Sequence, residues 1–503
     1  MSERISGTMP KNNSERALRF AGDLRGIPLS HLVVLLVFPM GLICTLTFYW
    51  PIGALGALPV FAAAWLIVGA FCCLMCKSMG RHAIWIPVLV FLLGSVVALG
   101  VARENLNRFD NLDTCSDDSL YLQLADKVAA EVRHAPIDIW EAADAIPKIN
   151  YTGYPVFLGY LFAPLQDSDA VRFAAAVTVN LAAVCLMFFS VVLLASALGP
   201  INRSLMLLVI FASLPELLYF SSLVLKDCIV AAMIIGMTVL LDHDRKLRPW
   251  KRLMLAGLIL VVLWNLRAPF VLIALLSLPL WVAARHKSFE RPMVTLLLAA
   301  LVAVVYSLTG SFLIRTLVGS DFEPAYGAGA FNLVTTGFGY GRKLYEFPVI
   351  GPIMFLILSP LPLNPLSMTT PWYFTDVLRS LGSLFSLGLL FAAFRGKLFK
   401  LLWQPIFLVS FTIYGLIIYA VALGVPDARY KLSAAPFLAL MAYTTSLYLH
   451  KLKPISPTSP ADLRGVRNER SLGLDEASVS RDSQMHFPPA YEEGAFNCTS
   501  EST

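Results

Sequence analysis

The sequence predicts an all-α protein that crosses a membrane many times. The chain has 503 residues, of which 57% are hydrophobic and 14% are charged, and its mean hydropathy is +0.70. Long apolar runs recur from Leu29 to Leu449, and a bilayer core needs about 20 apolar residues per spanning helix. These runs do not alternate as barrel strands do, and only helices or closed barrels satisfy the backbone in lipid, so we expect a helical bundle.

The chain begins with a polar leader and continues through about 12 apolar segments. Residues 1–28 carry four arginines and one lysine and lack the apolar core of a signal peptide, so we expect a cytoplasmic leader. Residues 29–449 are expected to form the transmembrane domain, and residues 450–503, rich in serine and proline, a disordered cytoplasmic tail. The predicted spans are Leu29–Tyr49, Ile52–Cys76, Ala83–Ala102, Ala170–Leu198, Ser204–Leu223, Cys228–Leu241, Leu253–Trp264, Ala268–Ala284, Met293–Leu313, Asp376–Phe394, Leu401–Gly424 and Tyr430–Leu449.

The basic residues predict the orientation of these spans. Lysines and arginines of the short loops fall on the side of the N-terminus, and the positive-inside rule places that side in the cytoplasm. Both termini are then cytoplasmic, and two long loops, residues 103–169 and 315–375, lie on the outer, periplasmic face of a bacterial inner membrane. The net charge of +6 arises from these clusters and does not indicate nucleic-acid binding. The clusters are Lys77 with Arg81, Arg203, and residues 242–252, 285–287, 395–400 and 450–453.

Two apolar pieces, Tyr154–Leu165 and Pro348–Leu361, are short for a span and flanked by proline. Counting either as one crossing would invert the charge pattern. We therefore expect both to be re-entrant or interfacial segments that form the lipid-facing walls of an outer cleft. The alternative is that both are ordinary short spans, which a bilayer accommodates by tilting or thinning. The predicted number of spans is accordingly about 12, within a range of 11 to 14.

Five polar groups interrupt or border the apolar segments, and all five fall on the predicted outer side. Ionisable residues in or beside spans are costly, which makes them functional candidates. The alternative for each group is a hairpin turn whose charges are solvated. The groups are Asp113 with Asp117 and Asp118, then Ser221–Asp227, Trp264–Pro269, Gly339–Lys343 and Pro426–Lys431.

The residue types in these groups fit the transfer of a sugar from a lipid-linked phosphate. A carboxylate such as Asp117 or Asp118 can take a proton from an acceptor hydroxyl or amine. Cations can stabilise a phosphate leaving group as its negative charge develops. Arg267 and Arg429 are the better anion ligands, because a guanidinium offers a rigid fork of donors to phosphate oxygens.

Four short motifs, in this order, resemble the GT-C superfamily of polyprenyl-phosphate-dependent glycosyltransferases. They resemble most the bacterial members related to the dolichyl-phosphate-mannose protein mannosyltransferases and the lipid A aminoarabinose transferase. The likeness extends over Asp110–Tyr448 as scattered motifs rather than continuous similarity. The motifs are Asp117-Asp118-Ser-Leu-Tyr121-Leu-Gln-Leu-Ala125, Gly153-Tyr154-Pro155, Leu225-Lys226-Asp227 and Arg429-Tyr430-Lys431.

The resemblance implies roles for individual residues. An acid of the first outer loop would be the catalytic base, here Asp118 or Asp117, and Asp227 at a later outer turn would assist it. We expect the donor's phosphate on the arginines, with the lysines as weaker ligands. The residues expected to bind substrate are Lys226, Arg267, Arg342, Lys343, Arg429, Lys431, Tyr121 and Tyr154.

Two features depart from the family pattern. The segment Leu29–Cys76 adds two spans before the acidic loop, where the family usually has one spanning helix in all. Some members bind a divalent metal, but His134 is the only histidine of the two outer loops and no acid–histidine pair stands out. No metal ligand is assigned, and the cofactor stays unknown.

The leading hypothesis is an inverting glycosyltransferase. It would transfer a sugar from a polyprenyl-phosphate-linked donor to a lipid, glycan or protein acceptor at the periplasmic face. Its other expected partners are membrane lipids, and no nucleic-acid partner is expected. The alternatives are an O-antigen-type polymerase or ligase, and a transporter or flippase of a lipid-linked or polar solute. Transporters place polar breaks near the midplane and often show two matching halves. Here the breaks lie toward one face and no internal repeat is visible, which favours the enzyme.

Overall fold

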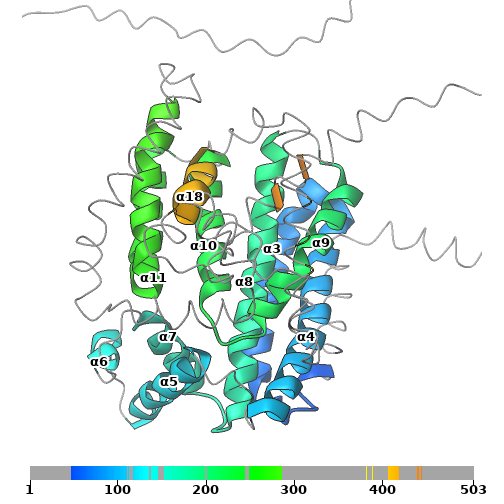
Figure 1. Cartoon of the computed structure of the whole chain (residues 1–503), viewed down its shortest axis with the longest axis vertical. Helices are drawn as coiled ribbons and strands as arrows, with labels where there is room; N and C mark the ends of the chain where they lie inside the picture. The colour runs from blue at the N-terminus through cyan, green and yellow to red at the C-terminus, as the bar shows by residue number, and fades with distance from the viewer. Residues whose placement is uncertain are drawn as a thin grey trace, which may run out of the picture. The chain divides into compact units, whose positions relative to one another are not determined.

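A computed structural model describes residues 43, 47–109, 112, 117–134, 138–144, 152–198, 201–243, 248–285, 381, 384, 388, 406–417, 439–440 and 443–444. Within these residues the chain is almost wholly helical and no strand occurs (Figure 1). The all-α prediction is therefore confirmed for this part of the chain. The main helices are α3 (Leu58–Met79), α4 (Trp85–Phe109), α5 (Asp117–His134), α6 (Ile139–Asp144), α7 (Gly153–Phe162), α8 (Asp169–Leu198), α9 (Arg203–Ser221), α10 (Asp227–Thr238), α11 (Pro249–Arg285) and α18 (Ile406–Ile417).

Four described helices are long and apolar enough to cross a membrane, and a bent pair makes a fifth candidate. Apolar side chains on α3 and α11 point outward, among them Leu66 and Leu258, as expected where lipid rather than water surrounds a helix. The chain is therefore a membrane protein. The four segments are Leu55–Cys76, Gly80–Asn107, Asp169–Ala197 and Trp250–Val282, and the bent pair is Arg203–Ile210 with Ser213–Ser221, at 48° to each other.

The described helices follow the predicted spans closely. Six helices each overlap one predicted span. The pairs are α3 with Ile52–Cys76, α4 with Ala83–Ala102, α8 with Ala170–Leu198, α9 with Ser204–Leu223, α10 with Cys228–Leu241, and α18 with Leu401–Gly424. The count of about 12 spans stays a prediction, because several segments lie wholly or largely outside the described residues. These are Leu29–Tyr49, Met293–Leu313, Pro348–Leu361, Asp376–Phe394, Tyr430–Leu449, the leader and the tail.

Helix α4 continues beyond Ala102, where its predicted span ends, to Phe109. Its last residues are polar, yet Asn105 is buried and its Nδ2 donates a hydrogen bond to the carbonyl oxygen of Leu112, at 3.0 Å. The drop in hydropathy after Ala102 therefore does not mark the end of the helix. The predicted loop of residues 103–169 contains three helices, α5, α6 and α7.

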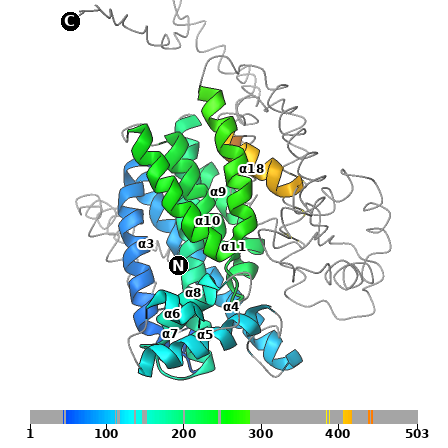
Figure 2. The same ribbon diagram turned by 90° about the vertical axis from the view of Figure 1, so that its left-hand side faces the viewer.

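Helix α8 is central and packs against α3, α4, α9 and α10. At one end of this bundle α5 packs along α7, as both views show (Figures 1 and 2). Gly159 makes this close approach possible, since a Cβ there would lie 2.4 Å from Cγ1 of Val128 and 3.0 Å from the carbonyl oxygen of Ala125. We call this the α5–α7 end of the bundle.

The opposite end carries a separate set of polar contacts. The guanidinium of Arg203 lies 3.3 Å from the point where a Cβ on Gly80 would stand. Trp281 Nε1 donates a hydrogen bond to Oδ1 of Asp242, at 2.6 Å. The guanidinium of Arg252 donates to the carbonyl oxygen of Leu241, at 3.4 Å. Arg203, Asp242 and Arg252 belong to the clusters that the sequence predicts on the cytoplasmic face.

Candidate functional site

Two buried tyrosines join α5 to the start of α7. The rings of Tyr121 and Tyr154 meet edge to face, with centroids 5.3 Å apart and an interplanar angle of 89°. Both side chains are buried. Aromatic pairs prefer this geometry because the positive edge of one ring meets the negative face of the other. The pair brings the Tyr of the acidic-loop motif against the Tyr of the Gly-Tyr-Pro motif.

Lys226 reaches this pair from another helix. It stands immediately before α10, is only 2% exposed, and donates a hydrogen bond from Nζ to the hydroxyl of Tyr121, at 2.5 Å. The same Nζ lies 4.6 Å from the centroid of the Tyr121 ring. A buried ammonium needs such partners, because removing it from water is costly.

Asp227 and Arg267 form a buried ion pair beside Lys226. Each residue is 5% exposed, and Arg267 Nη1 contacts Asp227 Oδ1. The guanidinium also lies 5.4 Å from the centroid of the Phe270 ring. A buried pair gains little over apolar packing, but removal of one partner leaves an uncompensated charge. The pair thus ties the first residue of α10 to the middle of α11.

Arg267 interrupts α11. Its backbone is extended (φ −163°, ψ 84°), so that α11 consists of two helical segments that meet at a kink at Arg267. Pro269 follows two residues later and has no N–H for the carbonyl of Asn265. The break lies where the sequence predicts a turn between Leu253–Trp264 and Ala268–Ala284.

The first residue of α7 packs directly on this break. A Cβ built on Gly153 would lie 2.7 Å from both the carbonyl oxygen and the Cβ of Asn265. Asn265 itself turns its Nδ2 to the carbonyl oxygen of Val261, at 2.9 Å. Only a residue without a side chain allows the two backbones to approach so closely. Gly153 therefore places Tyr154 next to the break that carries Arg267.

Asn180, in the middle of α8, holds the turn that carries Lys226. Its side chain is fully buried and Nδ2 donates to the carbonyl oxygen of Leu223, at 2.8 Å. This bond satisfies a buried carbonyl that would be costly to leave without a donor. Sequence reasoning missed Asn180. The available signal was a single amide within an apolar span.

A second polar cluster, also missed, fastens α5, α7 and α8 together. Arg172 contacts Asp126 at 2.8 Å and Asp169 at 2.9 Å, and it also pairs with Asp167. Arg133 donates to the carbonyl oxygens of Phe162, Ala163 and Leu165 just past α7, at 3.2, 2.9 and 3.3 Å. Burial raises the pKa of the Asp126 carboxyl, and the positive charge of Arg172 offsets only part of this shift.

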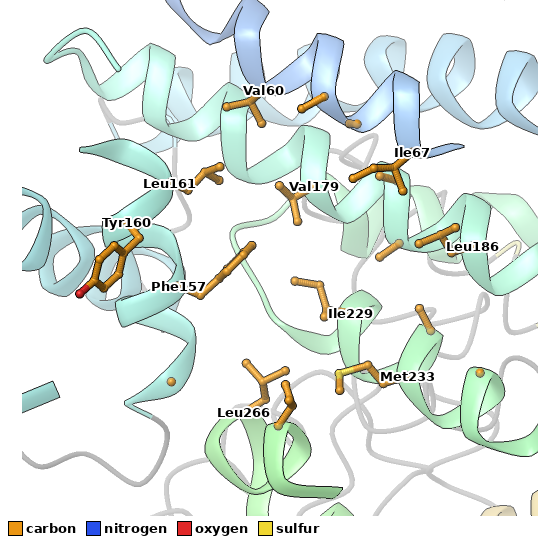
Figure 3. Close-up of a pocket in the computed structure, with 18 of the residues that line it drawn as sticks. Val60, Ile67, Phe157, Tyr160, Leu161, Val179, Leu186, Ile229, Met233 and Leu266 are labelled. Carbon is orange, nitrogen blue, oxygen red and sulfur yellow. The ribbon is translucent and has the colours of Figure 1, made fainter. Parts of the chain in front are cut away.

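An apolar cavity of about 880 Å³ lies between the helices of the bundle (Figure 3). Helices α3, α7, α8, α10 and α11 all contribute to its wall. Gly153, Ile229 and Leu266, at most two residues from Tyr154, Asp227 and Arg267, line it. Other residues that line the cavity include Val60, Ile67, Phe157, Tyr160, Leu161, Val179, Leu186 and Met233.

The structure brings together Tyr121, Tyr154, Lys226, Asp227 and Arg267, which lie in four separate stretches of the sequence. Asp117 and Asp118 are the first two residues of α5, and Asp118 stands three residues before Tyr121. Their side chains lie outside the described residues. Four further predicted ligands also lie outside them, namely Arg342, Lys343, Arg429 and Lys431.

Chemically, the α5–α7 end offers two cations and a phenol next to an apolar cavity, which suits a ligand with an anionic head and a hydrocarbon body. In the part of the chain that the structure describes, no group of three or more His, Cys, Asp or Glu side chains could hold a metal ion. No family model, curated protein or solved structure matches the chain. Its function is therefore inferred from its own residues and their geometry.

Proposed function

We propose that the protein is a glycosyltransferase that moves a sugar from a polyprenyl-phosphate-linked donor to a lipid, glycan or protein acceptor. The observation that carries this proposal is the contact of Lys226 with Tyr121, which packs on Tyr154, next to the Asp227–Arg267 ion pair. Asp118 opens the helix that bears Tyr121, one turn before it. The GT-C-like order of the motifs supports the same conclusion.

The proposal includes the arrangement in the membrane. About 12 spans would cross the inner membrane of a bacterium, with both termini in the cytoplasm and the α5–α7 end at the periplasmic face. The separation of Lys226 and Arg267 from Arg203 and the Asp242 segment supports this orientation. The arginines and lysines at 342, 343, 429 and 431 would complete the site from the later outer loops.

The transfer would proceed in one displacement step. Asp118 takes the proton from the acceptor's hydroxyl or amine, whose oxygen or nitrogen then bonds to the anomeric carbon of the sugar. The bond from that carbon to the phosphate oxygen breaks, and the phosphate leaves with the electron pair. Lys226 and Arg267 stabilise the charge that develops on it. Attack from the side opposite the phosphate inverts the anomeric centre.

Asp227 would act through Arg267. Its carboxylate holds the guanidinium in place at the break of α11. A phosphate arriving beside Arg267 would meet a guanidinium, whose planar fork of N–H donors suits phosphate oxygens. Asp117, adjacent to Asp118 in α5, is the residue that could replace it as base.

A transporter or flippase of a lipid-linked solute is the second candidate, because broken spans such as α11 are a feature of transporter binding sites. The two candidates differ in their product. An enzyme forms a new glycosidic bond and releases a polyprenyl phosphate, whereas a flippase moves the intact donor between leaflets.

The test uses the full-length protein in membranes supplied with radiolabelled lipid-linked sugars extracted from the source cells. We expect Asp118→Asn to lower the rate of transfer of label to acceptor strongly, and the Asp117→Asn, Asp118→Asn double variant to abolish it, while expression is unchanged, because the amide keeps the volume and loses the base. Glu131→Gln, an exposed carboxylate change in the same helix, is the matched control. Full transfer by Asp117→Asn, Asp118→Asn and the double variant would rule out the catalytic assignment. Movement of intact donor without any new bond would favour the flippase.

A further inference from the structure

The apolar cavity runs along the bundle rather than across it. Its lining on α8 extends from Val179 to Ser190, which corresponds to about 16 Å of helix. On α10 it extends from Ile229 to Gly236, about 10 Å in the same direction. This length approaches half of a bilayer core of about 30 Å, which is the depth of one leaflet.

Two polar residues of the wall, Ser190 and Asn265, direct donor groups to carbonyl oxygens of their own helices. Ser190 donates its hydroxyl to the carbonyl oxygen of Leu186, at 2.9 Å. Asn265 donates its Nδ2 to the carbonyl oxygen of Val261, at 2.9 Å. Nearly all other lining residues are apolar. A hydrocarbon is therefore the occupant that this wall suits, because a polar one would lose hydrogen bonds with water.

The cavity opens on the surface of the bundle. Ile67, Phe71, Phe157 and Val262 line it and are between 43% and 54% exposed. Ile67 and Phe71 belong to α3 and Val262 to α11, both of which are long and apolar enough to cross a membrane. A chain could thus enter sideways from lipid, without passing through water.

One end of the cavity is marked by charge. Gly153 and Leu266 line the cavity and are adjacent in sequence to Tyr154 and Arg267, and Lys226 bonds to Tyr121 beside them. Cations at this end of an apolar slot complement a lipid whose single phosphate terminates its chain.

We propose that this cavity holds the isoprenoid chain of the donor, with its phosphate at the Lys226–Arg267 end, and that Gly236 determines how far the chain can penetrate. The identity of the chain rests on the proposed function. Gly236 lies on α10 nine residues after Asp227, about 13 Å further from the charged end. It lines the cavity, and a Cβ built on it has no heavy atom within 4 Å. A larger side chain there occupies free space without disturbing the packing.

The experiment compares Gly236→Leu with Gly257→Leu in purified full-length protein. Gly257, on α11, also has no heavy atom within 4 Å of its Cβ site but does not line the cavity. The probes are photoreactive isoprenyl phosphates with a short and a long chain. We expect wild-type protein to be labelled on α3, α8 and α10 by both. Gly236→Leu should bind the long probe at least about tenfold more weakly, as the loss of two methylene contacts would give, and the short probe normally.

Gly236→Ala reports on folding, because its single added carbon meets nothing within 4 Å, and it should keep both probes. Equal labelling of Gly236→Leu and wild type by the long probe would overturn the proposal. So would an equal loss in Gly257→Leu, or full competition by a phospholipid of matched chain length, which would show a general lipid site.

The two proposals fail separately. Chain-length-dependent labelling without transfer from any donor would reject the glycosyltransferase and leave the cavity assignment intact. Transfer that persists while the probes label other parts of the protein would reject the cavity and leave the enzyme.

Discussion

Lys226 donates a hydrogen bond to Tyr121, a residue 105 positions earlier in the chain. The bond joins the turn before α10 to the helix of the acidic loop, and it is buried. Two of the polar groups that the sequence singles out are therefore parts of one site. The contact also predicts a coupling free energy between substitutions of the two residues, which can be measured.

We expect Tyr121→Phe and Lys226→Met to be coupled in a double-mutant cycle. Tyr121→Phe removes the acceptor from a buried ammonium and should cost about 1.5–3 kcal/mol, the range for hydrogen bonds to charged groups. In the Lys226→Met background the same change should cost at least about 1 kcal/mol less, because no charge is then left without its acceptor. The measurement is the free energy of unfolding in mixed micelles. Additive effects would mean that the two side chains do not interact in the folded protein.

Asp227→Asn should be among the most destabilising conservative changes in the described part of the chain. It leaves the buried Arg267 without its carboxylate, a situation that costs about 3–5 kcal/mol. Adding Arg267→Met should restore most of the loss, since the uncompensated charge is then gone. The exposed partner of Arg172, Asp169, is the control, because its side chain is 84% exposed and Asp169→Asn should cost less than about 1 kcal/mol. A double variant no more stable than Asp227→Asn would contradict the burial of this pair.

Gly153→Ala and Gly236→Ala should differ sharply although both glycines line the same cavity. The new methyl at 153 would lie 2.7 Å from the backbone of Asn265, whereas that at 236 meets nothing within 4 Å. We expect Gly153→Ala to cost about 1–3 kcal/mol through forced separation of α7 from α11, and Gly236→Ala to be close to neutral. Thermal unfolding of both variants in the same detergent makes the comparison. Similar melting temperatures for the two would show that α7 does not rest on the break of α11.

The stability contributed by Asp126 should depend on pH. Burial raises the pKa of this carboxyl above its ordinary value of 3.8, so the folded protein binds its proton more tightly than the unfolded chain does. Its contribution is then fully present below 3.8 and is lost as pH rises through the raised folded value. Asp126→Asn removes this dependence, so the stability of wild type relative to the variant should fall across that interval. A difference that grows with pH would show that the ion pair with Arg172 outweighs burial.

The sequence predicted the interruptions well because each is a local signal. Lys226-Asp227, Arg267 and Gly153-Tyr154 stand out against apolar neighbours, and the structure places breaks or helix starts at all of them. It could not predict the pairing, in which Lys226 meets Tyr121 and Asp227 meets Arg267, because pairing depends on which helices pack together.

Other features left weaker signals. Asn180 is one amide in an apolar span, and its importance appears only when Leu223 is found opposite it. Arg172 and Asp126 resemble solvated loop residues until α5 and α8 are brought together. The extension of α4 to Phe109 was missed because a fall in hydropathy does not by itself end a helix.

The ion pair between Asp227 and Arg267 also has a consequence for how the protein is made. Synthesis proceeds from the N-terminus, so Asp227 enters the membrane before its partner, 40 residues later, exists. A carboxylate near lipid is costly until it is paired, and the segment around α10 should therefore remain shielded by the insertion machinery until α11 follows. A chain truncated at residue 250 is expected to be degraded faster in cells than one truncated at residue 285. Equal lifetimes of the two truncated chains would show that assembly does not wait for the pair.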